Sequence, residues 1–273
     1  AELLYTEDEI PIRYDGSLST LRRNGTMYFF HSFGCRLGPA SKRRSRHSWH
    51  HGTPTDPLKI HHSSKTDDAF WDYNGFYQNM KEEGIWILGM YNPWPETTVV
   101  IPFEAGDEKT LGPKVNDRYF GKVPEDYLKV EEEKLFFRGD GTRRGKIGIT
   151  SQRSKGLAGS YDAAGQVLNI VTYNVQGAPN GFVNSMWELQ EEPYAGDVIN
   201  SYNDGSPEPG KPPLGPFYEL ETSSPAAALS PGETMRHVQR TFHIQGSEEE
   251  LDPLARRLLG ARLEVIKAAF QEE

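Results

Sequence analysis

The sequence predicts a mainly β protein, folded as a largely antiparallel sandwich or barrel. Many short runs rich in β-branched and aromatic residues follow one another between residues 84 and 245. Gly, Pro, Asn and Asp separate most of these runs, and these are the residues that turns require. No helical pattern alternates with the runs, so a parallel sheet with crossover helices is not expected.

The predicted strands are residues 84–90, 97–103, 128–137, 146–152, 156–162, 166–175, 182–190, 197–203, 216–223 and 234–245. The run Asp162-Ala-Ala-Gly165 predicts a hairpin loop between two of them. Two short helices are expected after the last strand. Ser247 and Glu250 form a capping-box pattern at the start of the first helix, and Gly260 is a natural stop.

Composition and charge exclude several classes of protein. The net charge of -9 argues against general nucleic-acid affinity, which depends on neutralising phosphates with Lys and Arg. No apolar stretch approaches the roughly 20 residues that span a bilayer, and the first five residues are no signal peptide. Cys35 is the single cysteine, so no internal disulfide or CxxC motif exists, and we interpret it as a small inert residue.

Residues 36–62 stand apart because they are basic and contain five of the eight histidines. We expect a basic His-rich loop here, because residues 41–55 show no hydrophobic period. The histidine spacing fits no known zinc pattern, so we expect no metal site, and no sequence fingerprint implies a cofactor. We divide the single expected domain into N-terminal strands (1–83), a β-sandwich body (84–246) and C-terminal helices (247–273).

Alternation along two predicted strands gives candidate catalytic residues. Glu219 and Glu221 share one face of their strand, and His237 and His243 share one face of another. A carboxylate and an imidazole brought together make a base and an acid that work near neutral pH. The alternative is a solvated outer face with salt bridges.

Candidate binding residues lie on two further segments. Asn203 and Asp204 end a strand in an Asn-Asp-Gly turn, where they present polar groups to a ligand or simply form the turn. Trp187 and Glu188 point to opposite faces of their strand. Trp187 is therefore either a stacking platform for a sugar or an ordinary core residue.

The C-terminal part contains Leu220-Glu221-Thr222, Pro225-Ala226, Pro231-Gly232-Glu233 and a closing strand. This order of motifs resembles the C-terminal signature of the aldose 1-epimerase (galactose mutarotase) superfamily. Residues from about 84 to 271 more closely resemble an uncharacterised bacterial family, a domain of unknown function, of that superfamily. Runs that carry this similarity are 85–90, 97–102, 112–117, 119–124, 184–188 and 200–205.

The resemblance implies an antiparallel β-supersandwich with a sugar or oligosaccharide site on a concave face. It assigns Glu221 as the base that takes the anomeric proton, and a histidine as the acid. No motif assigns that histidine here, so His31 and His237 are candidates by chemistry alone. Family members carry a longer N-terminal portion, so we expect residues 1–83 to be truncated or atypical. The resemblance also implies export to the periplasm or the medium.

Three functions follow as hypotheses. The first is a sugar epimerase that uses Glu221, with Glu219, Asp204, Asn203 and Trp187 shaping the pocket. The second is a noncatalytic carbohydrate-binding protein, because one fold hosts many functions. The third is a glycoside hydrolase or lyase with paired carboxylates.

Overall fold

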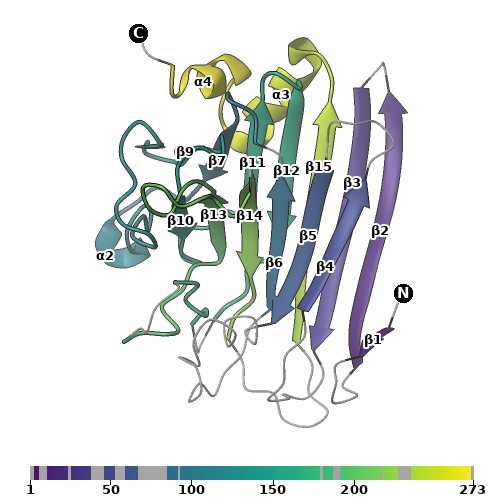
Figure 1. The fold of residues 1–273 in the computed structure, drawn as a ribbon, viewed down its shortest axis with the longest axis vertical. Coiled ribbons are helices and arrows are strands. Elements are labelled where there is room, and N and C mark those ends of the chain that lie inside the picture. Colours follow the sequence, from purple (N-terminus) through teal and green to yellow (C-terminus); the bar gives the residue numbers. More distant parts are fainter. Residues whose placement is uncertain are drawn as a thin grey trace.

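The computed structural model of the chain contains two antiparallel β-sheets that pack face to face (Figure 1). It describes residues 3–5, 11–23, 26–37, 46–52, 59–66, 85–91, 93–178, 181–186, 191–215, 217–226 and 235–271. Side chains are described at 89 and 91 and, within those ranges, from residue 93 onward except at 235 and 236. All strand pairs in these ranges are antiparallel, which confirms the predicted fold class.

In the described part of the chain, the larger sheet has nine strands in the order β1-β2-β3-β15-β12-β11-β7-β9-β8. Their bounds in that order are Leu3–Tyr5, Pro11–Arg23, Thr26–Leu37, Met235–Gln245, Val167–Tyr173, Leu157–Asp162, Thr98–Pro102, Lys134–Arg138 and Leu128–Val130. The smaller sheet has six strands in the order β10-β13-β14-β6-β5-β4. Their bounds in that order are Gly145–Ile149, Ile199–Asn203, Tyr218–Ser223, Ile85–Tyr91, Lys59–Thr66 and Arg46–Gly52.

The apolar core lies between the two sheets and is filled by alternate residues of their strands. The nine-stranded sheet contributes Val99, Ile101, Leu135, Phe137, Ala158, Val171 and Tyr173. The six-stranded sheet contributes Tyr91, Ile147, Ile149, Ile199, Tyr218 and Leu220. Because successive side chains on a strand point to opposite faces, the residues between these positions point away from the core.

A polar row also lies between the sheets, along β15. His237 and His243 are at most 1% exposed, so the alternative of a solvated outer face is wrong for this strand. The Nε2 atom of His237 is 2.8 Å from Oγ1 of Thr222, and Nδ1 of His243 is 2.6 Å from Oδ1 of Asn169. Each contact satisfies one ring nitrogen of its histidine, which burial would otherwise penalise.

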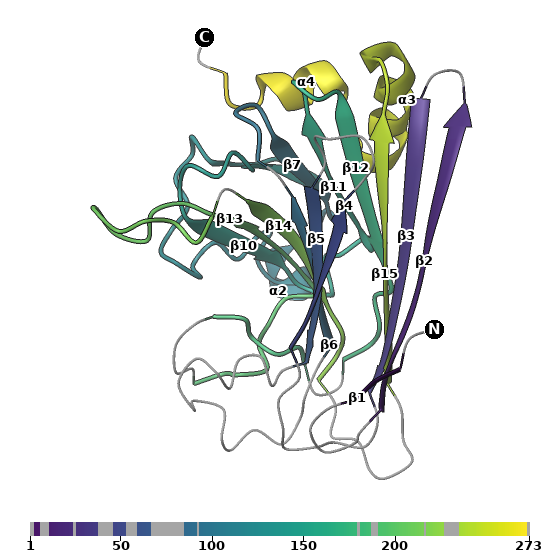
Figure 2. The same cartoon turned by 45° about the vertical axis from the view of Figure 1, so that its right-hand side comes forward.

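The opposite face of the nine-stranded sheet packs against the C-terminal helices, which lie toward one end of the molecule (Figures 1 and 2). Helices α3 (Glu248–Leu259) and α4 (Leu263–Ala268) form as predicted, with the capping box at Ser247 and a left-handed Gly260 at the end of α3. A shorter helix, α2 (Glu108–Leu111), lies in the loop after β7. None of the described helices is both long and apolar enough to span a bilayer.

Two strand predictions and one loop prediction differ from the structure. The predicted strand 128–137 is the hairpin β8–β9, because three consecutive glutamates at 131–133 form a turn in which the amide of Glu131 donates to the carbonyl of Lys134. The predicted strand 182–190 is reduced to one bridge between Phe182 and Ala195 in the described residues. The expected loop at 36–62 is wrong, because it contains β4 and the start of β5. Strands at the margin of a sheet pair through the backbone and need no alternating apolar pattern.

The close approach of α3 to the sheet depends on Gly159 in β11. A Cβ atom at this position would lie 2.5 Å from the carbonyl oxygen of Asn169 and 2.9 Å from Cδ2 of Leu259. We therefore expect Gly159→Ala to destabilise the protein by about 1–3 kcal/mol, the usual range for overpacking. Urea denaturation measures the change.

Gly177→Ala is the matched control, because a Cβ atom there has no described neighbour within 4 Å. It should change the free energy of unfolding by less than about 0.5 kcal/mol, as surface substitutions do. Equal stability of the two variants would contradict the tight packing of α3 on β11.

Candidate functional site

The outer face of the six-stranded sheet carries a set of polar side chains in register. Residues directly opposite each other on neighbouring antiparallel strands project from the same face. One row across β10, β13 and β14 is Lys146, Tyr202 and Glu219. The next row is Gly148, Asn200 and Glu221. The intervening residues, such as Tyr218 and Leu220, fill the core, so this face is separate from it.

A buried ion pair between Lys146 and Glu221 forms the centre of the site. The Nζ atom of Lys146 donates to Oε2 of Glu221 at 2.9 Å, and the two side chains are only 3% and 0% exposed. No described group reaches the other carboxylate oxygen, Oε1, which is also buried. A buried ion pair contributes little net stability, because desolvation offsets the attraction. This arrangement therefore suggests a role other than holding the fold together.

A second buried cluster lies beside the ion pair. Oδ2 of Asp197 accepts hydrogen bonds from the Tyr119 hydroxyl at 2.5 Å and from Nδ2 of Asn116 at 3.1 Å. The Tyr119 ring centroid is 5.3 Å from Nζ of Lys146, so this ring connects the two clusters. Lys146 also interacts electrostatically with the second cluster, because its positive charge favours the charged form of Asp197.

The backbone at the edge of the sheet positions this cluster. Asn116 forms an isolated antiparallel bridge with Gly148, with reciprocal amide–carbonyl bonds of 2.9 and 2.8 Å, and the chain then turns to place Tyr119 over the sheet. Gly148 is required here, because a Cβ atom would lie 2.0 Å from Oδ2 of Asp197. The missing side chain thus makes room for a carboxylate.

Burial changes the acidity of this cluster. Loss of water raises the pKa of Asp197 from 3.8 to about 6, although Tyr119, Asn116 and Lys146 each act in the opposite direction. Burial and the nearby Asp197 charge raise the pKa of Tyr119 well above its usual value. The site therefore combines a carboxylate held by a lysine with a carboxyl group that titrates near neutral pH. Pairs of this kind often divide the roles of base and acid.

The predicted residues around Glu221 occupy different places. Glu219 lies half-buried on the same face, one row along the sheet. Asp204 accepts from the Tyr202 hydroxyl at 2.7 Å and from the amide of Gly215 at 2.8 Å. Asn203 bonds the loop at 140–143 through both ends of its amide. The described contacts of Asn203 and Asp204 therefore fit a structural turn.

The structure does not bring His237 together with Glu221. His237 contacts Thr222, which faces the core, whereas the neighbouring residue Glu221 faces the outer side of the same sheet. The strand backbone therefore lies between the two groups. Burial also lowers the pKa of His237 to about 4, so this imidazole is uncharged at neutral pH. His237 is thus poorly suited to be the acid partner of Glu221.

The remaining candidates are less well defined. His31 lies in β3 of the other sheet, opposite Thr241 in the register, and its side chain is outside the described ones. Trp187 and Glu188 lie outside the described residues. In the described part of the chain, no three His, Cys, Asp or Glu side chains are placed to hold a metal ion.

Sequence reasoning missed Lys146, Asp197, Tyr119 and Asn116. One signal was available, because Lys146 stands in a predicted strand beside Ile147 and Ile149, where a buried strand rarely accepts a charge. Asn116 and Tyr119 also lie in runs that carry the resemblance to the uncharacterised family. Nothing in the sequence, however, showed that these segments meet across about 80 residues of chain.

The fold and the site define an antiparallel β-sandwich with a buried charged centre on the outer face of its smaller sheet. The chain belongs to a family of unknown function, DUF6786, whose sequence profile matches residues 73–270. This confirms the predicted membership of an uncharacterised family. A comparison with curated proteins found no match.

Two solved structures are similar to the chain. One is a putative aldose 1-epimerase from Escherichia coli K12, with 12% identity and a TM-score of 0.36 over 85% of this chain and 69% of that chain. The other is the Slr1438 protein from Synechocystis sp. PCC 6803, with 9% identity and a TM-score of 0.36 over 88% of this chain and 67% of that chain. At these identities and TM-scores, neither similarity carries an argument about this chain.

Replacing one partner of the buried ion pair should lower the stability strongly, whereas replacing both partners should lower it little. We expect Lys146→Met to destabilise the protein by about 3–5 kcal/mol, because Glu221 then stays buried without its cation. The double variant Lys146→Met/Glu221→Leu should regain most of this loss. Urea denaturation measures both.

Lys114→Met is the control, because it removes an equally short but exposed pair with Glu132 and should cost less than about 1 kcal/mol. A similarly small loss in Lys146→Met would contradict the buried pair.

Asp197 and His237 should change the stability of the protein in opposite directions as the pH changes. The folded pKa of Asp197, about 6, lies above its ordinary 3.8, so its contribution is present below pH 3.8 and lost as pH rises through 6. The folded pKa of His237, about 4, lies below its ordinary 6.5, so its contribution is present above pH 6.5 and lost as pH falls through 4. Between about pH 4 and 6 the two slopes partly cancel.

Asp197→Asn should therefore make stability fall more steeply on acidification than in the wild type. His237→Asn should instead make stability rise on acidification. Free energies of unfolding at pH 4, 5, 6 and 7 test this, and identical slopes for the three proteins would contradict it.

Proposed function

We propose that this protein binds a sugar on the outer face of the six-stranded sheet and interconverts its anomers, with Glu221 as the base. The proposal rests on the buried carboxylate of Glu221, in which one oxygen is bound by Lys146 and the other has no described partner. The resemblance of Leu220-Glu221-Thr222 to the mutarotase signature supports the choice of a sugar as substrate.

Lys146 prepares Glu221 for the role of base. Its ammonium group donates to Oε2 at 2.9 Å, which leaves Oε1 as the proton acceptor. A base works when its acceptor atom comes within hydrogen-bond reach of the proton that it removes. Oε1 is the only carboxylate oxygen of the ion pair that a substrate hydroxyl could engage without displacing the lysine.

Asp197 is the acid in this proposal, in place of His237. Its pKa of about 6 keeps a fraction of the group protonated near neutral pH, which suits proton donation. The Tyr119 hydroxyl bonds to Asp197 at 2.5 Å and provides a route for the proton. Lys146 lies close to both carboxyl groups and stabilises negative charge that develops on the sugar oxygens.

Ring opening moves one proton to Glu221 and one proton from the acid to the sugar, so the step is balanced. Glu221 removes the proton from the anomeric hydroxyl, the bond between C1 and the ring oxygen breaks, and the acid protonates the ring oxygen. Rotation about the C1–C2 bond and the reverse steps then give the other anomer. Both catalytic groups return to their starting states, so no cofactor is consumed.

Noncatalytic sugar binding is the second candidate, and complete burial of the site favours it. Glu221, Lys146, Asp197 and Tyr119 are all at most 5% exposed, so a sugar reaches Oε1 only after a covering residue moves. A binding protein makes this movement only when ligand enters or leaves, whereas an enzyme must make it in every turnover.

Polarimetry of freshly dissolved galactose and glucose tests the proposal. We expect the wild type to accelerate mutarotation, and Glu221→Gln to reduce the rate constant by about 100- to 10,000-fold, the usual contribution of a general base. Glu249→Gln, an exposed change on α3, is the matched control and should retain the wild-type rate.

Because Glu221→Gln leaves Lys146 buried without its carboxylate, circular dichroism must confirm that the variant folds. The wild type provides an independent test, since a wild-type rate equal to the uncatalysed rate excludes the epimerase for these sugars. Sugar binding without acceleration would favour the noncatalytic candidate.

A further inference from the structure

A separate pocket opens beside the candidate site, at the start of β10. Its walls come from two segments, the loop at 120–127 and the residues that lead into β10, with Phe137 behind them. The lining residues are Phe120, Gly121, Lys122, Val123, Pro124, Tyr127, Phe137, Arg143, Arg144 and Gly145. None of the roles assigned above uses these residues.

The pocket is basic in a protein that is acidic overall. Three of its lining residues are cationic and none is acidic, although the chain carries a net charge of -9. Lys122 and Arg143 are exposed, and neither forms an ion pair with a carboxylate of the described residues. A concave site with one sign of charge focuses its field and attracts a ligand of the opposite sign.

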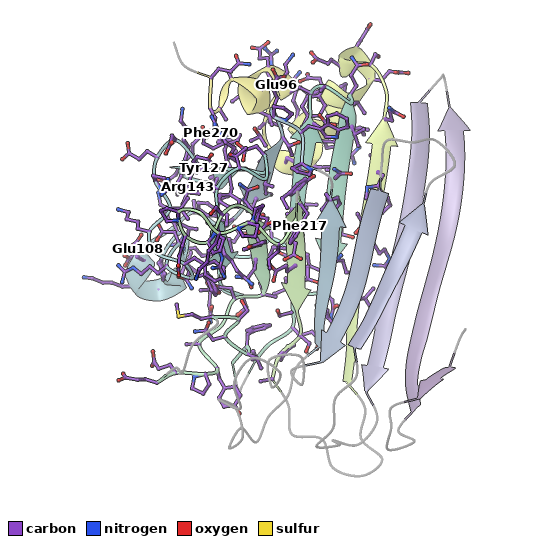
Figure 3. The ribbon with its side chains drawn as sticks, in the orientation of Figure 1. Glu96, Glu108, Tyr127, Arg143, Phe217 and Phe270 are labelled. Carbon is purple, nitrogen blue, oxygen red and sulfur yellow. The ribbon has the colours of Figure 1, made fainter. Side chains whose placement is uncertain are left out.

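Aromatic rings hold the two guanidinium groups in place. The Cζ atom of Arg144 is 3.9 Å from the Phe120 ring centroid, and that of Arg143 is 5.7 Å from the Tyr127 ring centroid. Figure 3 shows Tyr127 and Arg143 close together on the side of the molecule that carries β10. A ring contact orients the guanidinium plane, so that its N–H edge binds a carboxylate or phosphate with less loss of entropy.

The pocket borders the proposed sugar site. Arg144 and Lys146 are two residues apart along an extended segment, which corresponds to a separation of about 7 Å. The Phe120 ring meets the Tyr202 ring edge-on, with centroids 5.8 Å apart, and Tyr202 is the register partner of Lys146. A saccharide at Glu221 could therefore extend one substituent or one sugar unit into the pocket.

We infer that this pocket binds the anionic group of an acidic saccharide, either a carboxylate or a phosphate. The inference rests on the proposed function, because it deepens the substrate class of the same site. Arg143 and Lys122 provide the charge, and Phe120 and Tyr127 provide the walls. Neutral sugars would leave the cationic pocket without a partner and so bind less tightly.

Calorimetric titration with galacturonic acid, galactose 6-phosphate and galactose tests the inference. We expect at least one acidic sugar to bind the wild type about tenfold more tightly than galactose, as a charged hydrogen bond commonly provides. The two acidic probes distinguish a carboxylate from a phosphate. Arg143→Gln and Lys122→Gln should each remove most of this preference, whereas Lys155→Gln, an exposed change elsewhere, should keep it.

Inorganic sulfate is the remaining probe, and the outcomes separate the two proposals. Equal affinity for acidic and neutral sugars overturns the acidic-saccharide inference and leaves the proposed function standing. An acidic preference that survives Arg143→Gln and Lys122→Gln also overturns the inference. Sulfate binding without binding of any sugar, or no binding at all, overturns both proposals.

Discussion

Strict alternation along strand β14 is the constraint on which both the core and the candidate site depend. Tyr218 and Leu220 must fill the space between the sheets, and this directs Glu221 to the outer face. A slip of one residue would place the carboxylate in the apolar core and move the core residues to the outer face. The pairing of β14 with β13 and β6 prevents such a slip, because it holds the register on both sides.

The buried polar groups fix the placement of the strands more than they add to the stability of the fold. Between the sheets, His237 and His243 each need an exact partner, Thr222 or Asn169, so only one placement of β15 satisfies them. On the outer face, Lys146 needs the carboxylate of Glu221 for the same reason. A sandwich with apolar residues at these positions could be equally stable, which suggests that the charged centre is kept for its chemistry.

The sequence predicted the strands of the body well, because turn residues and β-branched runs report local backbone preferences. The helix start at Ser247 and the hairpin at Asp162 were predicted for the same reason. Prediction failed at β4, whose sequence shows no alternating apolar pattern, and at residues 131–133, where a run of charge interrupts a strand. Among site residues, the sequence pointed to Glu221 but not to its partners.

The sequence by itself therefore determined the class of fold, the family and the face that Glu221 occupies, because each follows from residues near one another in the chain. Only the tertiary structure decided which groups meet Glu221. Lys146 lies on β10 and Glu221 on β14, and the pairing of both strands with β13 brings the two side chains together. The same pairing separated His237 from Glu221, because adjacent residues on a strand face opposite sides, and a sequence pattern cannot reveal which side a distant strand covers.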